Sequence, residues 1–179
     1  MSLLAEQLVE EWLNRQGFFT IRGVRDGVHE IDLLAIRPSE SGVDAWHIEV
    51  QVSFRPIGYL GQLSPEQQKE MSVRSKNSAK TRNTQQIEES ITDWVKKKYH
   101  SHTKISARER AWKDAKWKMK FVHGVVKENE ELVHISNFGI DVIPFSRVLD
   151  EICNPKQSSF VAGSGTDIAE ILKFYKPNN

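Results

Sequence analysis

Two short acidic stretches of the sequence could bind a divalent metal ion. They are Glu30-Ile-Asp32 and Glu49-Val-Gln51, each with one residue between its polar members. Side chains alternate along a strand, so residues two positions apart lie on one face. If the stretches form neighbouring strands, Asp32 and Glu49 come close together, and the backbone carbonyl of Val50 could add a ligand. Hard cations such as Mg²⁺ bind carboxylate oxygens, with water and substrate phosphate completing the shell.

Glu6 is a third candidate carboxylate, because it borders the apolar face of a predicted helix. The spacing of Leu8, Val9 and Leu13 predicts this helix over residues 3–16. On a helical projection Glu6 lies beside Leu13 and three residues from Val9. A carboxylate in that place can look over the edge of the sheet and hold a metal-bound water.

A simpler interpretation is that these acidic residues lie on the solvent-exposed face of a hairpin. Charged side chains are rarely buried, and Arg22, Arg25 or Arg55 could pair with them. The two interpretations differ in whether Asp32 and Glu49 are close enough to share an ion.

Three strands are expected after the first helix. Apolar runs predict strands over residues 18–25, 28–36 and 45–54, and Asp26-Gly27 is a strong tight-turn signal between the first two. A second turn region covers residues 38–42. In the third strand, Trp46, Ile48, Val50, Val52 and Phe54 form one face, and His47, Glu49, Gln51, Ser53 and Arg55 form the other.

Helices and a further strand follow this meander. Residues 62–83 are polar and predict a loop or the irregular start of a helix, whereas apolar residues at helical spacing over 87–95 predict an amphipathic helix. That helix ends in Lys96-Lys97-Lys98, a charge run that complements the helix dipole. Residues 117–126 predict a strand, with 132–135 as its hairpin partner. The remaining expectations are a partly helical stretch over 100–113 and short helices over 145–152 and 167–175.

Together these elements predict an α/β fold, in which a mixed β-sheet is flanked by helices. The core order is helix, three strands, helix, strand. The length of 179 residues suits a single domain, and 39% hydrophobic with 27% charged residues is typical of a globular chain. We expect a core over about residues 3–126, with C-terminal additions over about 130–179.

The cysteine content and the apolar runs bear on location. Cys153 is the one cysteine, so no intrachain disulfide can form, and a reducing cytoplasmic setting fits. No apolar run approaches the roughly 20 residues that span a membrane. The N-terminus turns acidic too early for a signal peptide. We therefore expect a cytoplasmic protein without a membrane partner.

Charge is distributed unevenly along the chain. The formal net charge is +1, but residues 69–120 contain 15 Lys and Arg against 6 Asp and Glu, a net of +9. Such a segment suggests a surface that binds a polyanion, and a solvated helix and loop is the alternative. The candidate nucleic-acid contacts are Arg74, Lys76, Lys80, Arg82, Lys118 and Lys120.

These features together resemble the PD-(D/E)XK nuclease superfamily, the fold of many restriction enzymes and Holliday-junction resolvases. The resemblance covers residues 3–55 well and extends to about residue 126. It implies a restriction-endonuclease-like fold in which a helix glutamate, a strand aspartate and the next strand's glutamate bind metal. The matching residues are Glu6, eleven positions before Gly17; the stretch Glu30-Ile-Asp32-Leu-Leu-Ala35; and Ile48-Glu49-Val-Gln51.

Gln51 departs from the pattern of this superfamily. The residue two positions beyond the strand glutamate is usually a lysine that positions the attacking water. Glutamine orients water by hydrogen bonds but supplies no positive charge. Some restriction enzymes of the superfamily are similar in having glutamine here. In other members the lysine comes from the following helix, for which Lys69, Lys76 and Lys80 are the candidates.

The resemblance implies a Mg²⁺- or Mn²⁺-dependent nuclease that hydrolyses DNA phosphodiester bonds. Asp32 and Glu49 would ligate the metal. Glu6 would hold a metal-bound water or a second ion, and Gln51 would orient the nucleophile. The alternative is a catalytically inactive module on the same fold that binds nucleic acid or a protein partner. The sequence leaves open whether RNA is bound and whether the chain forms a homodimer. We expect His47 to be a surface histidine beside Glu49.

Overall fold

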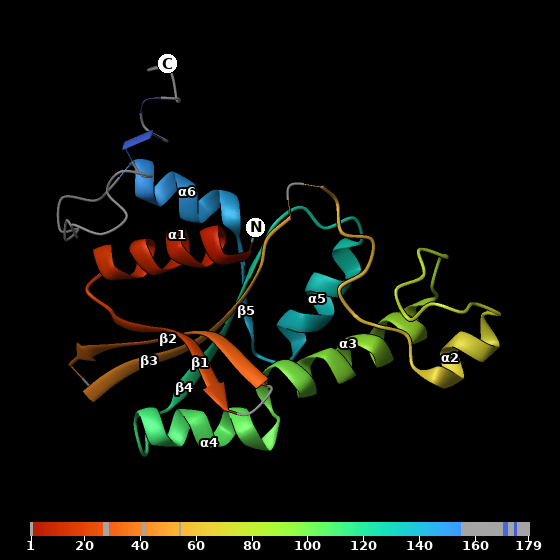
Figure 1. Ribbon diagram of the computed structural model, residues 1–179, viewed down its shortest axis with the longest axis horizontal. Coiled ribbons are helices and arrows are strands. Elements are labelled where there is room, and N and C mark those ends of the chain that lie inside the picture. Colours follow the sequence, from red (N-terminus) through yellow and green to blue (C-terminus); the bar gives the residue numbers. More distant parts are fainter. Residues whose placement is uncertain are drawn as a thin grey trace.

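The computed structural model describes residues 2–26, 29–40, 42–53 and 55–154, together with 170, 171 and 174. These residues form a five-stranded mixed sheet with helices on both faces (Figure 1). The strands lie in the order β1-β2-β3-β4-β5. Among the described residues, no helix combines the length and apolar character needed to cross a membrane. The expected position of Phe54 on the third strand and most of the helix expected over 167–175 lie outside this part of the chain.

The first three strands form the antiparallel meander that the sequence predicts. They are β1 (Phe19–Asp26), β2 (His29–Ser39) and β3 (Gly42–Gln51). Asp26 pairs with His29, so the connection has two residues, as the Asp-Gly signal indicates. Gly27 and Val28 themselves lie outside the described residues.

The last two strands, β4 (Trp117–His123) and β5 (Asp141–Pro144), extend the sheet in parallel. The chain between β3 and β4 contains α2 (Pro65–Glu70), α3 (Thr84–Tyr99) and α4 (His102–Ala111). The polar segment over 62–83, expected to be a loop or the irregular start of a helix, therefore contains the short helix α2. Parallel pairing requires a long crossover of this kind, and helices usually form it.

The predicted hairpin partner over residues 132–135 is wrong, because those residues lie in a helix, α5 (Asn129–Asn137). A short apolar run fits the period of a strand and of a helix equally well. The partner of β4 is instead β5, which was not expected. The helix that follows, α6 (Phe145–Cys153), agrees with the prediction over 145–152.

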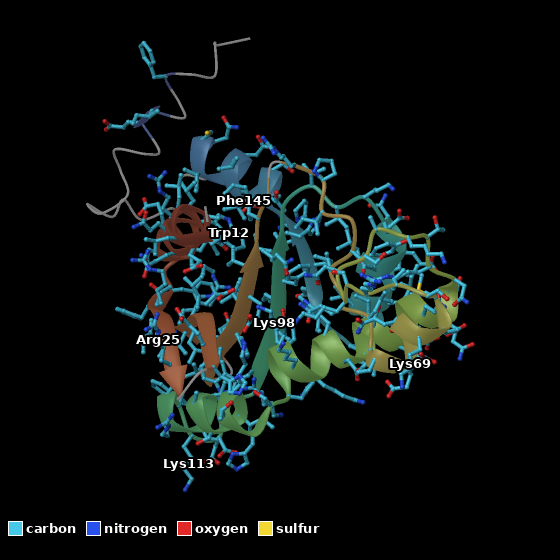
Figure 2. All side chains as sticks on the ribbon, turned by 45° about the vertical axis from the view of Figure 1, so that its right-hand side comes forward. Trp12, Arg25, Lys69, Lys98, Lys113 and Phe145 are labelled. Atoms are coloured by element: carbon cyan, nitrogen blue, oxygen red, sulfur yellow. The ribbon has the colours of Figure 1, made fainter. Side chains whose placement is uncertain are left out.

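One face of the sheet packs on α1 (Ser2–Arg15) and on α6. Leu33, Ile48 and Val122 from three strands meet Leu13 and Val148 from these helices, and all five are fully buried. Figure 2 shows Trp12 and Phe145 in this layer, between the helices and the strands. Burial of apolar area at about 25 cal/mol per Å² is what holds the layers together.

The other face of the sheet is covered by α3, α4 and α5. Phe121 of β4 packs there on Trp94, Tyr99 and Ile135. The predicted alternation of β3 is confirmed in its apolar half, since Ile48 and Val50 face α1. Its polar half does not face solvent, because α3 and α4 cover it. His47 and Glu49 of that half are therefore buried and must find partners, whereas Arg55, beyond the end of β3, is exposed.

Candidate functional site

Strands β2 and β3 separate at Asp32. Their ladder ends at the pair Leu33–Ile48. Beyond it, the carboxylate of Asp32 accepts a hydrogen bond from the backbone nitrogen of Val50 at 2.7 Å. On the other side, in the β1–β2 ladder, Asp32 falls between two registered pairs, at the position of Gly23 (φ 66°). The carboxylate of Asp32 is thus fixed at the place where β3 carries Glu49.

Glu49 is fully buried and is held by three side chains. Its Oε2 accepts from Lys98 Nζ at 2.8 Å, and its Oε1 accepts from His47 Nε2 at 2.9 Å. Lys104 of α4 forms an ion pair with the same Oε1. The lysines come from consecutive helices of the crossover, so the β3–β4 connection itself supplies the cations that neutralise Glu49.

His47 lies behind Glu49 and is completely buried, so the expectation of a surface histidine is wrong. Its Nδ1 lies 2.7 Å from Arg108 Nη1 of α4. Arginine only donates and a carboxylate only accepts, so the ring carries its proton on Nε2 and donates it to Glu49. Burial lowers the pKa of His47 to about 4, which keeps the imidazole neutral at pH 7.

The two strand carboxylates have pKa values shifted in opposite directions. Burial and then the charge of Glu49 raise the pKa of Asp32 to about 6. Burial alone would raise the pKa of Glu49 too, but the hydrogen bond from His47 and the charges of Lys98 and Lys104 lower it to about 2. Neighbouring titratable groups whose pKa values are pushed apart are typical of functional sites.

Glu6 of α1 is also buried, and its charge acts on both sides of this site. It raises the pKa of Asp32 and contributes to raising the pKa of Lys98. The structure therefore brings Glu6, Asp32 and Glu49 within electrostatic reach of one another. Glu30 is not part of the group, because it is exposed and forms an ion pair with Arg25 at 3.1 Å.

The lysine that approaches Glu49 from the following helix is Lys98. Lys69, Lys76 and Lys80 were the candidates for this role, and none of them is the lysine that holds Glu49. Figure 2 shows Lys98 at the end of α3 beside the strands, whereas Lys69 lies on α2, far from the sheet. Lys80 instead donates to the carbonyl of Met71 at 2.7 Å. Burial alone would lower the pKa of Lys98, but the charges of Glu49 and Asp32 raise it, so this side chain is an ammonium ion.

Gln51 lies two residues beyond Glu49 and lines a cavity of about 390 Å³ together with Lys98. An amide and an ammonium group therefore line one cavity, and the ammonium group contacts Glu49. No local pattern distinguishes Lys98, because it is one of three consecutive lysines at a helix end. Lys104 and Arg108 are four residues apart, so they share a face of α4, together with Ala107. This spacing is a weak signal of a buried polar face.

The six expected nucleic-acid contacts fall into two groups. Arg82 and Lys120 are buried: the Arg82 guanidinium lies 3.9 Å from the Tyr59 ring, and Lys120 pairs with Asp141. They stabilise the fold rather than a ligand. The exposed members are Arg74, Lys76, Lys80 and Lys118, of which Lys118 pairs with Asp44 at 2.9 Å.

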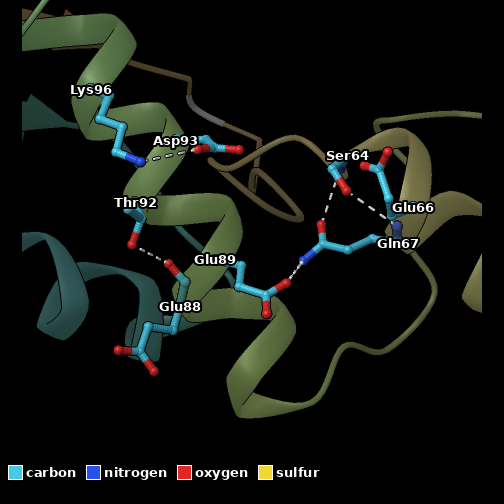
Figure 3. Close-up of a pocket in the computed structure, with 8 residues that line it drawn as sticks. All are labelled: Ser64, Glu66, Gln67, Glu88, Glu89, Thr92, Asp93 and Lys96. Atoms are coloured by element: carbon cyan, nitrogen blue, oxygen red, sulfur yellow. Dashed lines mark hydrogen bonds and ion pairs between the residues drawn. The ribbon is translucent and has the colours of Figure 1, made fainter.

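A second hollow beside α3, which shares Ser64 and Asp93 with the cavity at Gln51, is acidic (Figure 3). We call it the acidic hollow; its volume is about 520 Å³. Its ion pair, between Asp93 and Lys96, is 3.8 Å long and solvent-exposed. The residues that line it are Ser64, Glu66, Gln67, Glu88, Glu89, Thr92, Asp93 and Lys96.

The described residues contain no group of three or more His, Cys, Asp or Glu side chains placed to hold a metal ion. A cage made by the protein alone is therefore absent from this part of the chain. Asp32 and Glu49 remain as a pair of neighbouring carboxylates, and Mg²⁺ is usually held by one or two carboxylates with water and substrate phosphate.

Comparison with known proteins defines the class of fold. The chain is a mixed α/β protein with a five-stranded sheet flanked by helices. It is similar to the crystal structure of a protein of unknown function, AF1548, with a TM-score of 0.50 and 13% sequence identity over 97% of this chain and 79% of that chain. At this identity the likeness concerns the fold alone. No protein-family model and no curated protein matches the sequence.

Proposed function

We propose that this protein is a metal-dependent nuclease that hydrolyses DNA phosphodiester bonds at Asp32 and Glu49. The observation that carries the proposal is the ion pair between Lys98 and Glu49 at the point where β2 and β3 separate. It adds, from the next helix, the positive charge that Gln51 does not supply. The resemblance to PD-(D/E)XK nucleases, including the restriction-endonuclease-like fold, supports the same assignment.

The carboxylates fit a Mg²⁺- or Mn²⁺-type site that the substrate completes. Asp32 and Glu49 would hold the ion, and Glu6 adds a third negative charge nearby. When bound, such an ion lowers the pKa of a water molecule and stabilises charge on the scissile phosphate. Since Lys98 already contacts Oε2 of Glu49, cation binding and this ion pair compete for one oxygen.

The chain's own residues would position the reactants. The ammonium group of Lys98 attracts the phosphate and stabilises the charge that develops on it. The amide of Gln51 orients the attacking water by hydrogen bonds. His47, Lys104 and Arg108 do not reach the substrate side; they hold Glu49 in place from behind. DNA binding would depend on salt, because exposed residues such as Arg74 and Lys76 would contact phosphates.

A second candidate function is a non-catalytic module that binds nucleic acid or a protein partner. The observation that favours it is that both oxygens of Glu49 are already paired with cations or His47. A carboxylate neutralised in this way can serve stability alone. The two functions differ in whether a divalent ion binds at Asp32.

Cleavage of supercoiled and branched DNA with Mg²⁺ or Mn²⁺ tests the proposal. The wild type is compared with Asp32→Asn and with Glu30→Gln, an exposed acidic change on the same strand. We expect cleavage by the wild type and by Glu30→Gln and none by Asp32→Asn. Calorimetric titration with Mn²⁺ gives a second measurement. Absence of both cleavage and Mn²⁺ binding in the wild type would leave the binding module as the better assignment.

A further inference from the structure

The cavity beside Gln51 extends away from the carboxylates along α3, and we call it the residue-51 cavity. It begins at Lys98, which contacts Glu49, and it reaches Ser90. Eight residues of helix at 1.5 Å each correspond to roughly 12 Å. Its volume of about 390 Å³ falls in the range of roughly 300–1,000 Å³ in which proteins bind small organic molecules. One end of this cavity therefore lies next to the candidate site, at Lys98 and Gln51.

The residue-51 cavity is lined by both apolar and polar side chains. Leu60, Leu63 and Trp94 line it, and each is less than a tenth exposed. Trp94 is fixed by Phe121, whose ring lies 4.9 Å away and nearly perpendicular to it. The exposed Gln62 also lines the cavity and adds a hydrogen-bonding group. A flat apolar group with a polar edge suits such a space.

The wall formed by residues 60–65 is anchored from a distant part of the chain. The fully buried carboxylate of Glu131 accepts from the backbone nitrogens of Leu60 and Gly61 at 2.7 and 3.0 Å. Arg82 donates to the carbonyl of Gly61 at 2.8 Å. Three hydrogen bonds to two adjacent residues make this wall a fixed part of the structure.

Gly61 also sets the width of the cavity, because it allows the wall to approach α3 closely. A Cβ atom added at Gly61 would lie 2.6 Å from Ser90 Oγ and 2.9 Å from the Ser90 backbone carbon. Contacts this short do not occur, so any larger residue would move the wall away from the helix. The cavity therefore has a defined shape before any ligand binds.

The charges in the residue-51 cavity favour a ligand with a phosphate group. Lys97 and Lys98 line it, and Asp93 is the carboxylate among the residues that line it. Lys98 lies at the end of the cavity that is beside Glu49, next to the place where the scissile phosphate would lie. A nucleotide has its phosphate at one end and a flat base at the other. In the cavity, the phosphate would lie at Lys98 and the base against the apolar wall.

We propose that the residue-51 cavity binds one unpaired nucleotide of the DNA, next to the phosphate that is cleaved. The proposal rests on the proposed function and adds the class of substrate: DNA that carries an unpaired base at the cut. The base lies against Leu60, Leu63 and Trp94, and aromatic and apolar walls bind any base by stacking. A fully paired duplex must first extrude a base at a cost in free energy, so it binds more weakly.

The test is equilibrium binding of two dye-labelled duplexes, measured by fluorescence anisotropy in EDTA at fixed salt. One duplex is fully paired and the other carries a single unpaired adenine. We expect wild-type protein to prefer the unpaired site by about 10-fold, which is a modest share of the cost of extruding a base. Leu63→Trp fills the cavity and should abolish the preference, so that the two duplexes bind with equal affinity.

A pair of surface variants provides a control that does not touch the core. Lys97→Glu places a negative charge in the residue-51 cavity, whereas Lys96→Glu makes the same change in the neighbouring acidic hollow. The preference should fall in Lys97→Glu and remain in Lys96→Glu. Equal effects of both variants would show that only the overall charge matters and would overturn the proposal.

The two proposals fail in different ways in these experiments. A preference for the unpaired site without cleavage in Mg²⁺ or Mn²⁺ would support the nucleotide site and reject the nuclease. Cleavage without any preference in the wild type would support the nuclease and reject the nucleotide site. No binding to either duplex, together with no cleavage in Mg²⁺ or Mn²⁺, would reject both.

Discussion

Two groups of carboxylates lie beside α3, and they differ in how they are neutralised. Glu49 is fully buried, with Lys98, Lys104 and His47 around it. In the acidic hollow, the ion pair between Asp93 and Lys96 joins side chains that are both 69% exposed (Figure 3). Solvent screens such a pair, so it contributes little. Burial and fixed partners are therefore better indicators of a functional carboxylate than the number of carboxylates in a group.

The largest expected contrast is in DNA cleavage. Asp32→Asn removes one charge from the candidate metal site, and we expect cleavage to fall by about 1,000-fold or more, equivalent to about 4 kcal/mol. Glu88→Gln removes one charge from the acidic hollow and should leave cleavage unchanged. Initial rates on supercoiled plasmid measure both. A similar loss of cleavage in the two variants would show that the two groups of carboxylates do not differ in function.

Stability should show the next contrast. Glu49→Gln leaves Lys98 and Lys104 without their partner, and breaking a buried ion pair costs about 3 kcal/mol or more. Glu88→Gln, on the exposed side, should change stability by about 0.5 kcal/mol at most. Urea unfolding at pH 7 gives both values.

The contribution of Glu49 to stability depends on pH with a defined sign. The pKa of Glu49 is lowered to about 2 from the ordinary 4.5, so its contribution is present above pH 4.5 and is lost as the pH falls towards 2. The difference between wild type and Glu49→Gln should shrink over the same range. A constant difference would mean that Glu49 stabilises the fold by packing alone.

Two lysines on α3 allow a sharper comparison. Lys98→Met should lower cleavage by about 10- to 100-fold, because a positive charge next to the reacting phosphate is lost. Glu49 would keep His47 and Lys104, so the fold should persist. Lys96→Met, two residues away in the acidic hollow, should have no effect. If Lys98→Met remained fully active, Lys98 would serve only to neutralise Glu49.

The smallest expected effect is a gain in stability. The pKa of Asp32 is raised from 3.8 to about 6, so its ionisation destabilises the fold as the pH rises through 6. A shift of this size corresponds to about 3 kcal/mol, and partial exposure reduces it to about 1–2 kcal/mol. Metal-free Asp32→Asn should be more stable than wild type by this amount at pH 8.

The gain in Asp32→Asn should disappear below pH 4, where the wild-type carboxyl group is also neutral. Asp93→Asn in the acidic hollow is the matched control and should not become more stable. Thermal unfolding in EDTA measures both variants. A destabilised Asp32→Asn would show that the hydrogen bond to Val50 outweighs the cost of the buried charge.

The meander and its two strand carboxylates were predictable because the signals are local. The turn at Asp26-Gly27 and the alternation of β3 are each contained in a few adjacent residues. They place Asp32 and Glu49 on neighbouring strands without knowledge of the rest of the chain. The prediction that these two carboxylates lie together depends only on that register.

The cations of the site could not be predicted, because they depend on how distant elements pack. Which of Lys96, Lys97 and Lys98 reaches Glu49 is decided by the rotation of α3 against the sheet. Lys104 and Arg108 belong to a helix with a largely polar sequence, whose buried face no apolar periodicity reveals. The burial of His47 follows from the same helix. The helical state of residues 132–135 could not be predicted for the same reason, since α5 packs against α3.

The parallel pairing of β3 with β4 also has a consequence for folding kinetics. Ala45 pairs with Trp117, and the whole crossover, with Lys98 and Lys104, lies between them. Closing so long a loop is slow, because its entropy must be lost before the contacts form. Until the crossover docks, Glu49 stays hydrated and the sheet keeps an open edge at β3. Intermediates with that edge exposed are the species in which this chain would aggregate.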